Sequence, residues 1–410
     1  MNGRIFFIGL RAALAIVTVT LFVTSARAQA PWEKVLYSFN GAGGGWPWAG
    51  LVFDTRGNLY GTAAGGASNC AAGGCGTVFQ LSHKVGGGWT YTVLRSLDAA
   101  DGFDPYAGVI FDPAGNLYGT TVYGGAYGVG TVFELRQQGV RRWTEKLLYS
   151  FNGENGDGGN PLAALIFDAA GNLYGTTRGG GTAFELSPEA GGGWMHKLVY
   201  SLDITSSNGL IFDAAGNLYG TTGEWGTNFD YYGTVFELSP EAGGGWTETV
   251  LYVFNSTDGS QPSGLIFDTD GHLYGTTSGG GAYGYGTVFE LSPEAGGGWT
   301  EKVLHSFDGT DGAVPLAGLI FDPAGNLYGT TWQGGDLTQC DGRGCGTVFE
   351  LSTNADGSWT ETILHSFDPK CHNDGVNPGS GVIFDAAGHL YGTTVYGGAY
   401  GYGTVFEITP

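Results

Sequence analysis

The sequence predicts an all-β fold, a β-propeller with seven blades of four antiparallel strands, and three observations lead to this prediction. The phrase GNLYGTT, or a close variant of it, stands seven times in the chain. A segment led by tryptophan, such as WTEKLLYSF (143–151), recurs at intervals of 51 to 60 residues, a period typical of propellers and repeat arrays. The chain begins with a segment of this tryptophan type and ends with GTVFEITP, the segment that elsewhere precedes one.

Each repeat contains four segments with the composition of β-strands. In one copy they are GLIFD (264–268), HLYGTT (272–277), GTVFELS (286–292) and WTEKVLHSF (299–307). All four are rich in β-branched and aromatic residues, and Gly, Pro or Asp separates them. A glycine is unfavourable inside a strand such as LYGTT, so we expect it to accommodate an aromatic ring from a neighbouring sheet.

The repetition itself follows from the way blades pack. A blade is buried on both faces, against the blade before it and the blade after it, so the same apolar residues must recur. Seven copies close a ring around a channel and leave only short, protected edges. If the strands run outward in chain order, the N-terminal segment Trp32–Phe39 completes the last blade. We therefore expect this segment to close the ring without a covalent bond.

The FDxxGN link between the first two strands has the composition of a tight hairpin. Its Asp can accept hydrogen bonds from turn N–H groups, and its Gly can take the left-handed conformation. We interpret the aspartates as structural rather than catalytic or metal-binding. They are Asp54, Asp112, Asp168, Asp213, Asp268, Asp322 and Asp385. We give the same interpretation to the histidines that replace Asn in this link (His272, His389) and Tyr in LYSF (His305, His365).

The N-terminus has the pattern of a secretory signal peptide, predicted to span residues 1–28. Arg4 and Arg11 flank the start of an apolar run, and a small-residue ARA motif ends at Ala28. An uncleaved membrane anchor is the alternative, but the strongly apolar stretch 12–23 is short for a membrane span. We expect residues 29–410 to form a single seven-repeat domain that is secreted, periplasmic or extracellular, and free of the membrane after cleavage.

The charge of the chain restricts its partners. The net charge is −22, and loss of the three arginines of the signal peptide would leave −25. Such an acidic protein repels nucleic acids and anionic lipid surfaces. We therefore expect no nucleic-acid partner, and a monomer that binds an extracellular glycan or protein.

Five cysteines follow the predicted signal peptide. Cys70 and Cys75 in CAAGGC, and Cys340 and Cys345 in CDGRGC, occupy equivalent places in the first and sixth repeats. In an oxidising compartment this spacing predicts two local disulfides. A zinc site is the alternative, and the absence of neighbouring histidines in the sequence weakens it. We expect Cys371 to be an unpaired thiol in a loop.

The unit LYGTT…GG…GTVFEL resembles the Gloeo/Verruco (GloVer) repeat of exported bacterial proteins, over essentially the whole chain after the signal peptide. Its order of Gly doublet, aromatic strand and tryptophan strand, as in LYGTTSGGG…GTVFELSPEAGGGWTE, is also kelch-like. The resemblance implies an exported repeat protein and carries no settled activity or residue role. The chain ends at Pro410 without a C-terminal anchor segment, which favours release from the cell.

The connections between strands fall into two groups, which antiparallel strands place on opposite faces. The FDxxGN turns and SPEAGGGW links belong to one face, named here the turn face, and are nearly constant. The connections from LYGTT to GTVFEL and from blade to blade belong to the other, the loop face. The connections from LYGTT to GTVFEL range in length from 3 to 14 residues. Because packing constrains these loops least, we expect the loop face to carry the function.

Aromatic residues collect in these variable loops. Four tryptophans outside the repeat pattern and ten tyrosines lie there, and such rings can stack on sugars or bind a protein partner. Mutual packing that stiffens Gly-rich loops is the alternative. The short loop RGG (178–180), between longer aromatic loops, predicts a notch. The predicted ligand-binding residues are Trp46, Trp48, Tyr123, Tyr127, Arg178, Trp225, Tyr231 and Trp332.

Acidic loop segments offer a possible calcium site. DAADGFD (98–104), NGENGDGG (152–159) and DGTDG (308–312) alternate oxygen ligands with Gly. None has the spacing of an EF-hand, and Asx-rich turns explain them equally well. The candidate ligands are Asp98, Asp101, Asp104, Asp308 and Asp311; we expect no other cofactor.

We interpret the sequence as that of a non-enzymatic binding protein that uses the loop face. Catalysis needs unlike groups that converge, and few singular acids, bases or nucleophiles break the repetition. One alternative is a polysaccharide-cleaving enzyme that uses Arg178, Glu224 and Asp230 near the notch. The other is a structural surface or matrix protein without a small ligand.

Overall fold

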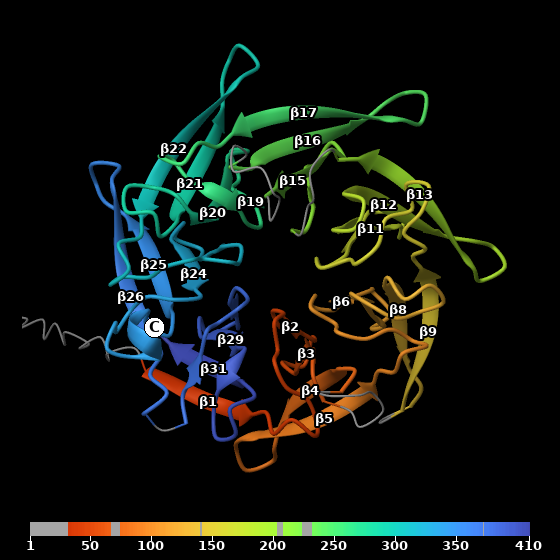
Figure 1. Ribbon diagram of the computed structural model, residues 1–410, viewed down its shortest axis with the longest axis horizontal. Coiled ribbons are helices and arrows are strands. Elements are labelled where there is room, and N and C mark those ends of the chain that lie inside the picture. Colours follow the sequence, from red (N-terminus) through yellow and green to blue (C-terminus); the bar gives the residue numbers. More distant parts are fainter. Residues whose placement is uncertain (1–31, 67–73, 140–141, 203–207, 224–231, 372) are drawn as a thin grey trace, which may run out of the picture. The chain divides into compact units, whose positions relative to one another are not determined.

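The computed structural model describes residues 32–66, 74–139, 142–202, 208–223, 232–371 and 373–410. Pro31–Pro410 form one compact unit, in which seven four-stranded antiparallel sheets follow one another around a ring (Figure 1). The predicted all-β, seven-bladed propeller is confirmed. The predicted signal peptide lies outside the described residues. Among the residues described, no helix has the length and apolar character needed to cross a membrane.

In six blades the strands follow chain order from the centre of the ring outward, and in the seventh β1 takes the outermost place after β28, β29 and β31 (Figure 1). The innermost strands are β2 (Val52–Phe53), β6 (Ile110–Phe111), β10 (Ile166–Phe167), β14 (Ile211–Phe212), β19 (Ile266–Phe267), β23 (Ile320–Phe321) and β28 (Ile383–Phe384). The second strands, which contain LYGTT, are β3 (Leu59–Ala63), β7 (Leu117–Thr121), β11 (Leu173–Thr177), β15 (Leu218–Thr222), β20 (Leu273–Gly279), β24 (Leu327–Thr331) and β29 (Leu390–Thr394).

The two outer strands of each blade are longer. The third strands are β4 (Thr77–His83), β8 (Thr131–Gln137), β12 (Thr182–Pro188), β16 (Thr234–Pro240), β21 (Thr287–Pro293), β25 (Thr347–Thr353) and β31 (Thr404–Thr409). The outermost strands are β5 (Trp89–Ser96), β9 (Trp143–Ser150), β13 (Trp194–Ser201), β17 (Trp246–Val253), β22 (Trp299–Ser306), β26 (Trp359–Ser366) and β1 (Trp32–Ser38). Short loop elements complete the described structure: β18 (Ser260–Pro262), β27 (Gly375–Val376), β30 (Tyr396–Gly397) and the 3-10 turn η1 (Cys340–Gly342).

The ring closes through the N-terminal strand, as the sequence predicted. β1 pairs antiparallel with β31, so the last blade combines β28, β29 and β31 with the first strand of the chain. An ion pair of 3.0 Å joins Lys34 Nζ to Glu407 Oε2 across this pair of strands. The pairing position of the leading tryptophan differs by one residue from that in the other blades, because WEKVLYSF (32–39) is one residue shorter than WTETILHSF (359–367). Trp32 pairs with Thr409. In the blade of Trp359, the residue equivalent to Thr409 is Ser352, which pairs with Thr360, whereas the leading tryptophan pairs with Thr353.

The core consists of seven apolar clusters, one at each junction between blades. At every junction the Tyr of LYGTT meets the Phe of the next blade's innermost strand edge to face, with ring centroids 5.0 to 5.2 Å apart. The pairs are Tyr60–Phe111, Tyr118–Phe167, Tyr174–Phe212, Tyr219–Phe267, Tyr274–Phe321, Tyr328–Phe384 and Tyr391–Phe53. The repeated Tyr is therefore the contact that joins each blade to the next.

The two threonines of LYGTT have separate roles. The first donates from its hydroxyl to a backbone carbonyl of the following blade, as Thr330 Oγ1 does to Ser380 O at 2.8 Å. The second shares a hydrogen bond with the first residue of the third strand, as in the 2.8 Å contact between the hydroxyls of Thr331 and Thr347. Both groups are buried, and a buried hydroxyl needs such partners.

The glycine of LYGTT accommodates an aromatic ring, but the ring belongs to its own blade. Gly329 pairs directly with Phe349 across strands β24 and β25. A Cβ atom on Gly329 would lie 2.6 Å from Phe349 Cζ. The expectation that a neighbouring sheet supplies the ring was therefore wrong, because the cross-strand register already places the Phe over the Gly.

The FDxxGN link forms the predicted hairpin turn. Asp54 Oδ1 accepts from the backbone N–H of Arg56 and Asn58 at 2.8 and 2.9 Å, and Gly57 has a φ of +78°. Where histidine replaces Asn, its Nδ1 takes over the contact with the Asp, as His272 does at 2.9 Å from Asp268 Oδ2. The structural interpretation of these aspartates is confirmed for this turn geometry.

Candidate functional site

The loop face is built from segments that pair with one another above the blades. In several blades the segment before the innermost strand pairs antiparallel with the start of the loop after the second strand. Isolated bridges Phe103↔Tyr123 and Ala313↔Gln333 are two examples, and β27 pairs with β30 in the last blade. This pairing extends β-structure into Gly-rich loops and fixes where their aromatic side chains lie.

Four rings from these loops form one group, named here the aromatic cluster: Trp48, Tyr106, Trp332 and Tyr396. Trp48 and Trp332 stack with ring centroids 5.0 Å apart and an interplanar angle of 8°. Tyr106 lies against Trp48 at 5.6 Å, and Tyr396 meets Trp332 nearly edge to face at 6.1 Å and 71°. Aromatic pairs at these separations attract each other beyond their buried area.

The aromatic cluster draws on four different blades. Trp48 precedes β2 and Tyr106 precedes β6, whereas Trp332 follows β24 and Tyr396 forms the start of β30. The blades of Trp48 and Trp332 are not neighbours in the ring, since the blade of β28 stands between them. Blades that are not neighbours come close enough for two aromatic side chains to touch only near the central axis of the propeller. The aromatic cluster therefore lies at the loop-face end of the central channel.

The cluster is only partly shielded from solvent. Trp48, Tyr106 and Trp332 are half-buried, and Tyr396 is 40% exposed. Burial first, and then the nearby Asp104 and neighbouring tyrosines, raise the pKa of Tyr106; burial also raises the pKa of Asp104. The Tyr106 hydroxyl is therefore neutral at ordinary pH and can both donate and accept a hydrogen bond.

The other predicted ligand-binding residues do not join the aromatic cluster through direct ring contacts. Trp46 packs on Tyr402 at 5.6 Å, and Tyr123 stacks on Phe103 at 5.4 Å while remaining 42% exposed. These contacts fit the alternative of mutual loop packing. Tyr127 is 65% exposed, and Arg178 is exposed.

The proposed notch and its acid–base group fall largely outside the described structure. Trp225, Tyr231, Glu224 and Asp230 all lie outside the described residues. Tyr106 and Tyr396 were recognisable in the sequence only as loop tyrosines. Their meeting with the two tryptophans depends on the curvature of the ring, for which the linear sequence holds no signal.

The aspartates considered for calcium take part in turns and ion pairs. Asp98 Oδ1 accepts from two backbone N–H groups at 2.8 and 3.1 Å, and Asp101 pairs with Arg95. Asp308 Oδ1 accepts from Thr310, and Asp311 Oδ2 contacts His305 Nε2 at 2.9 Å. Within the described residues, none of these aspartates, nor Asp104, belongs to a group of three possible metal ligands.

One of the two predicted disulfides lies wholly in the described structure. Cys340 and Cys345 are bonded, with Cα atoms 5.4 Å apart. Cys75 is disulfide-bonded and fully buried, and Cys70, its predicted partner, lies outside the described residues. Cys371 is a free, exposed thiol, as expected.

The junctions between outermost strands carry a further polar pattern. A side chain near the end of one such strand bonds an Asp in the following loop, as Tyr252 does to Asp258 Oδ2 at 2.8 Å. The next blade's outermost strand places Glu301 close by, and its Oε1 is buried without a hydrogen-bond partner. Burial first, and the charge of Asp258 second, raise the pKa of Glu301 to about 7.

We expect Glu301 to make the free energy of unfolding decrease as pH rises. Its folded pKa lies above the ordinary value of 4.5, so the stabilising contribution is complete below pH 4.5 and is lost as pH passes through 7. Tyr252 and Asp258 are the titratable groups that face Glu301. After allowance for partial solvent exposure, the decrease is about 1–2 kcal/mol. Urea unfolding at pH 5 and pH 8 measures it.

The substitution Glu301→Gln is expected to remove this component of the pH dependence. Glu294→Gln, at an exposed position of the neighbouring turn, is the matched control and should leave the pH dependence as in the wild type. An unchanged difference between pH 5 and pH 8 in Glu301→Gln would contradict the assignment.

Clefts are also present on the turn face, between adjacent blades. One of about 760 Å³ lies between the second and third blades and includes Asp112, Arg136 and Trp194 in its lining. Another of about 810 Å³ lies between the sixth and seventh blades. The walls of both clefts include the repeated Phe and Asp of two neighbouring blades and the Tyr of the second strand between them. They therefore follow from blade packing, whereas the aromatic cluster is built from residues that the repeat does not contain.

Comparison with known proteins supports the fold and identifies the family. No curated protein matches the chain. A solved protein from Lactobacillus plantarum is 14% identical, covers 82% of this chain and 88% of its own, and has a TM-score of 0.53. A gluconolactonase from Xanthomonas campestris is 15% identical over 73% of this chain and 83% of its own, with a TM-score of 0.42. At these identities no activity is transferred to this chain.

The model of the Gloeobacter/Verrucomicrobia repeat matches residues 20–184, 67–244 and 206–410. These ranges together include all seven copies of the LYGTT strand and the loops between them. The recurring contacts of that strand explain why a single repeat model recurs along the chain. The chain therefore belongs to the Gloeobacter/Verrucomicrobia repeat family.

Proposed function

We propose that this protein is a secreted, non-enzymatic binding propeller whose aromatic cluster binds an extracellular carbohydrate. The observation that carries this proposal is the stacked pair of Trp48 and Trp332, flanked by two tyrosines, at the end of the channel. None of these residues belongs to the repeated set that holds the blades together. Large aromatic rings that are not needed for blade packing and remain partly exposed are typical of binding surfaces.

The chemistry of the aromatic cluster favours a neutral glycan. The apolar face of a sugar ring can stack on the exposed parts of the tryptophans, while the hydroxyl of Tyr106 can exchange hydrogen bonds with sugar hydroxyls. The net charge of −22 and the nearby Asp104 repel anionic polysaccharides. A ligand that spans the channel end would contact loops from four blades at once.

Replacement of Trp332 by alanine is expected to weaken glycan binding at least tenfold. The change removes one half of the stacked pair and leaves the blades intact, because Trp332 lies outside the seven junction clusters. Affinity electrophoresis with neutral polysaccharides, followed by calorimetric titration with oligosaccharides of the retained polymer, measures the loss. Tyr283→Ala is the matched control, since Tyr283 is 64% exposed and lies in another blade; its affinity should change less than twofold.

Three results would speak against the proposal. Equal glycan affinities of the wild type and the Trp332→Ala variant would show that the aromatic cluster is not part of the binding surface. Release of reducing sugar ends from any polysaccharide would favour the enzymatic alternative. Concentration-dependent self-association without added glycan, seen by light scattering, would favour a structural role.

A further inference from the structure

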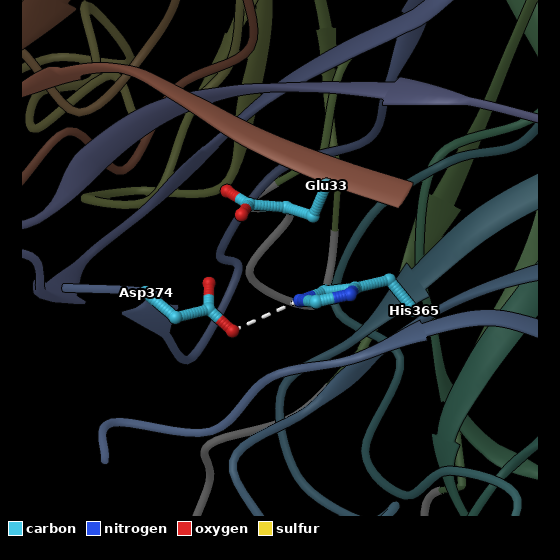
Figure 2. A group of neighbouring side chains, drawn as sticks. All are labelled: Glu33, His365 and Asp374. Atoms are coloured by element: carbon cyan, nitrogen blue, oxygen red, sulfur yellow. Dashed lines mark hydrogen bonds and ion pairs between the residues drawn. The ribbon is translucent and has the colours of Figure 1, made fainter. Parts of the chain in front are cut away.

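Three side chains that are far apart in the sequence meet where the N-terminal strand closes the ring. Glu33 lies on β1, His365 on β26, and Asp374 in the loop before β27. Figure 2 shows their polar ends facing a common space, with His365 Nε2 2.9 Å from Asp374 Oδ2. One ligand atom from each residue lies within 4.8 Å of the other two.

Two carboxylate oxygens in this group are left without partners. Asp374 is only 4% exposed, and its Oδ1 has no hydrogen-bond partner; the same holds for the buried Oε1 of Glu33. Buried carboxylate oxygens in this state are costly unless they are paired or coordinate a cation. We propose that Glu33, His365 and Asp374 bind a divalent transition-metal ion, of which zinc is the representative.

The ligand set restricts the class of metal. One imidazole nitrogen with two carboxylate oxygens suits Zn²⁺, Co²⁺, Ni²⁺ or Mn²⁺, whereas Ca²⁺ prefers six to eight oxygens. Ligands of a tetrahedral ion with bonds of about 2.1 Å lie about 3.4 Å apart. The ligand atoms lie within 4.8 Å of one another, so binding would bring the most widely separated pair closer by up to about 1.4 Å.

Equivalent junctions in the same chain show what distinguishes this one. The preceding junction has His305, Asp311 and Glu361 in the same strand and loop positions, and another has Tyr252, Asp258 and Glu301. In the part of the chain that the structure describes, only the Glu33 group converges to within 4.8 Å. The repeat thus supplies the scaffold, and among the residues that the structure describes only the closing junction brings three such ligands together.

A metal at this place would have a structural consequence. β1 is attached to the rest of its blade only by pairing with β31, and no described residue precedes it. An ion held by Glu33 of β1 and by His365 and Asp374 of the adjacent blade would join the two blades at the closing junction. Metal binding would then raise the melting temperature, because the ion binds the folded ring and not the unfolded chain.

The test uses the secreted chain with Cys371→Ser as the background, so that the exposed thiol cannot bind the ion. After treatment with a chelator and its removal, titration with ZnCl₂ is expected to show one site and a rise in melting temperature that the chelator reverses. His365→Tyr should lower zinc affinity at least thirtyfold. This variant is expected to fold, because Tyr252 makes the equivalent hydrogen bond to Asp258. His305→Tyr is the matched control and should bind zinc as the background does.

A second readout separates coordination from a merely structural effect. Co²⁺ added in place of zinc should give visible absorption bands of a tetrahedral site in the background and in His305→Tyr, and these bands should be lost in Glu33→Gln and His365→Tyr. Absence of a zinc site in the background chain would overturn the proposal. Zinc affinity that is unchanged in both Glu33→Gln and His365→Tyr would overturn it as well.

Discussion

A chain that begins at Phe39, and therefore lacks β1, is expected to lose cooperative folding. Without β1, the edge of β31 is open and its fully buried Val405, Phe406 and Ile408 become accessible to water. Each such side chain contributes about 1.5–3 kcal/mol when buried. Full exposure of all three would cost about 4.5–9 kcal/mol, which is comparable with the whole stability of a typical domain. Scanning calorimetry and circular dichroism would show a broadened or absent unfolding transition, and the exposed edge should promote aggregation.

A circular permutant provides the control for this truncation. Trp32 lies opposite Thr409, so a short linker can connect the end of β31 to β1. Residues 241–245 (EAGGG) already connect the third and outermost strands of another blade. A chain that starts at Gly41 and continues after Pro410 with EAGGG and residues 31–40 should recover the cooperative transition. Closure by β1 would be contradicted if the truncated chain had the stability of the wild type. It would also be contradicted if the permutant did not recover the cooperative unfolding transition.

The substitution Gly329→Val is expected to destabilise the propeller by about 3 kcal/mol or more. Its Cβ would lie 2.6 Å from Phe349 Cζ and 2.9 Å from Leu319 Cδ2, both in the closed interior. Overpacking of this kind forces side chains from their preferred rotamers. Strand propensity alone would predict the opposite sign, since Val favours strands and Gly does not. Equilibrium unfolding in urea distinguishes the two expectations.

Two further variants isolate the steric cause. Gly243→Ala has no atom within 4 Å of its new Cβ and should change stability by less than about 0.5 kcal/mol. The double variant Gly329→Val with Phe349→Leu should be less destabilised than the sum of its single changes by at least about 1 kcal/mol, because the smaller side chain relieves the clash. Additive effects would assign the cost to something other than the Gly–Phe contact.

Much of the architecture follows from local patterns that recur. The hydrogen-bond partners of the Asp in the FDxxGN link lie within six residues of it, as Arg56, Asn58 and Tyr60 do for Asp54, so composition suffices to predict the turn. The β-branched and aromatic residues of LYGTT and GTVFEL predict strands, and the recurrence of the same apolar residues in every repeat predicts that both faces of a blade are buried. The missing last strand and the unpaired first one together predict β1 as the closing strand, and the β1–β31 pairing confirms it.

Other features depend on register and could not be read from the chain. The glycine of LYGTT was assigned to a neighbouring sheet, whereas the pairing of Gly329 with Phe349 places the ring in the same blade. Which ring lies over the glycine depends on the register of the strand pairing, and sequence pattern alone does not fix register at that level.

The sequence by itself determined the number of blades, their strands, the closing strand and the face on which variation is concentrated, because each of these rests on contacts between neighbours in the repeat. Only the tertiary structure decided which singular residues meet. Trp48 and Trp332 come from blades that are not adjacent, and Glu33 meets His365 from the other end of the chain. The physical reason is closure: bending the row of blades into a ring brings together residues whose separation along the chain carries no local signal.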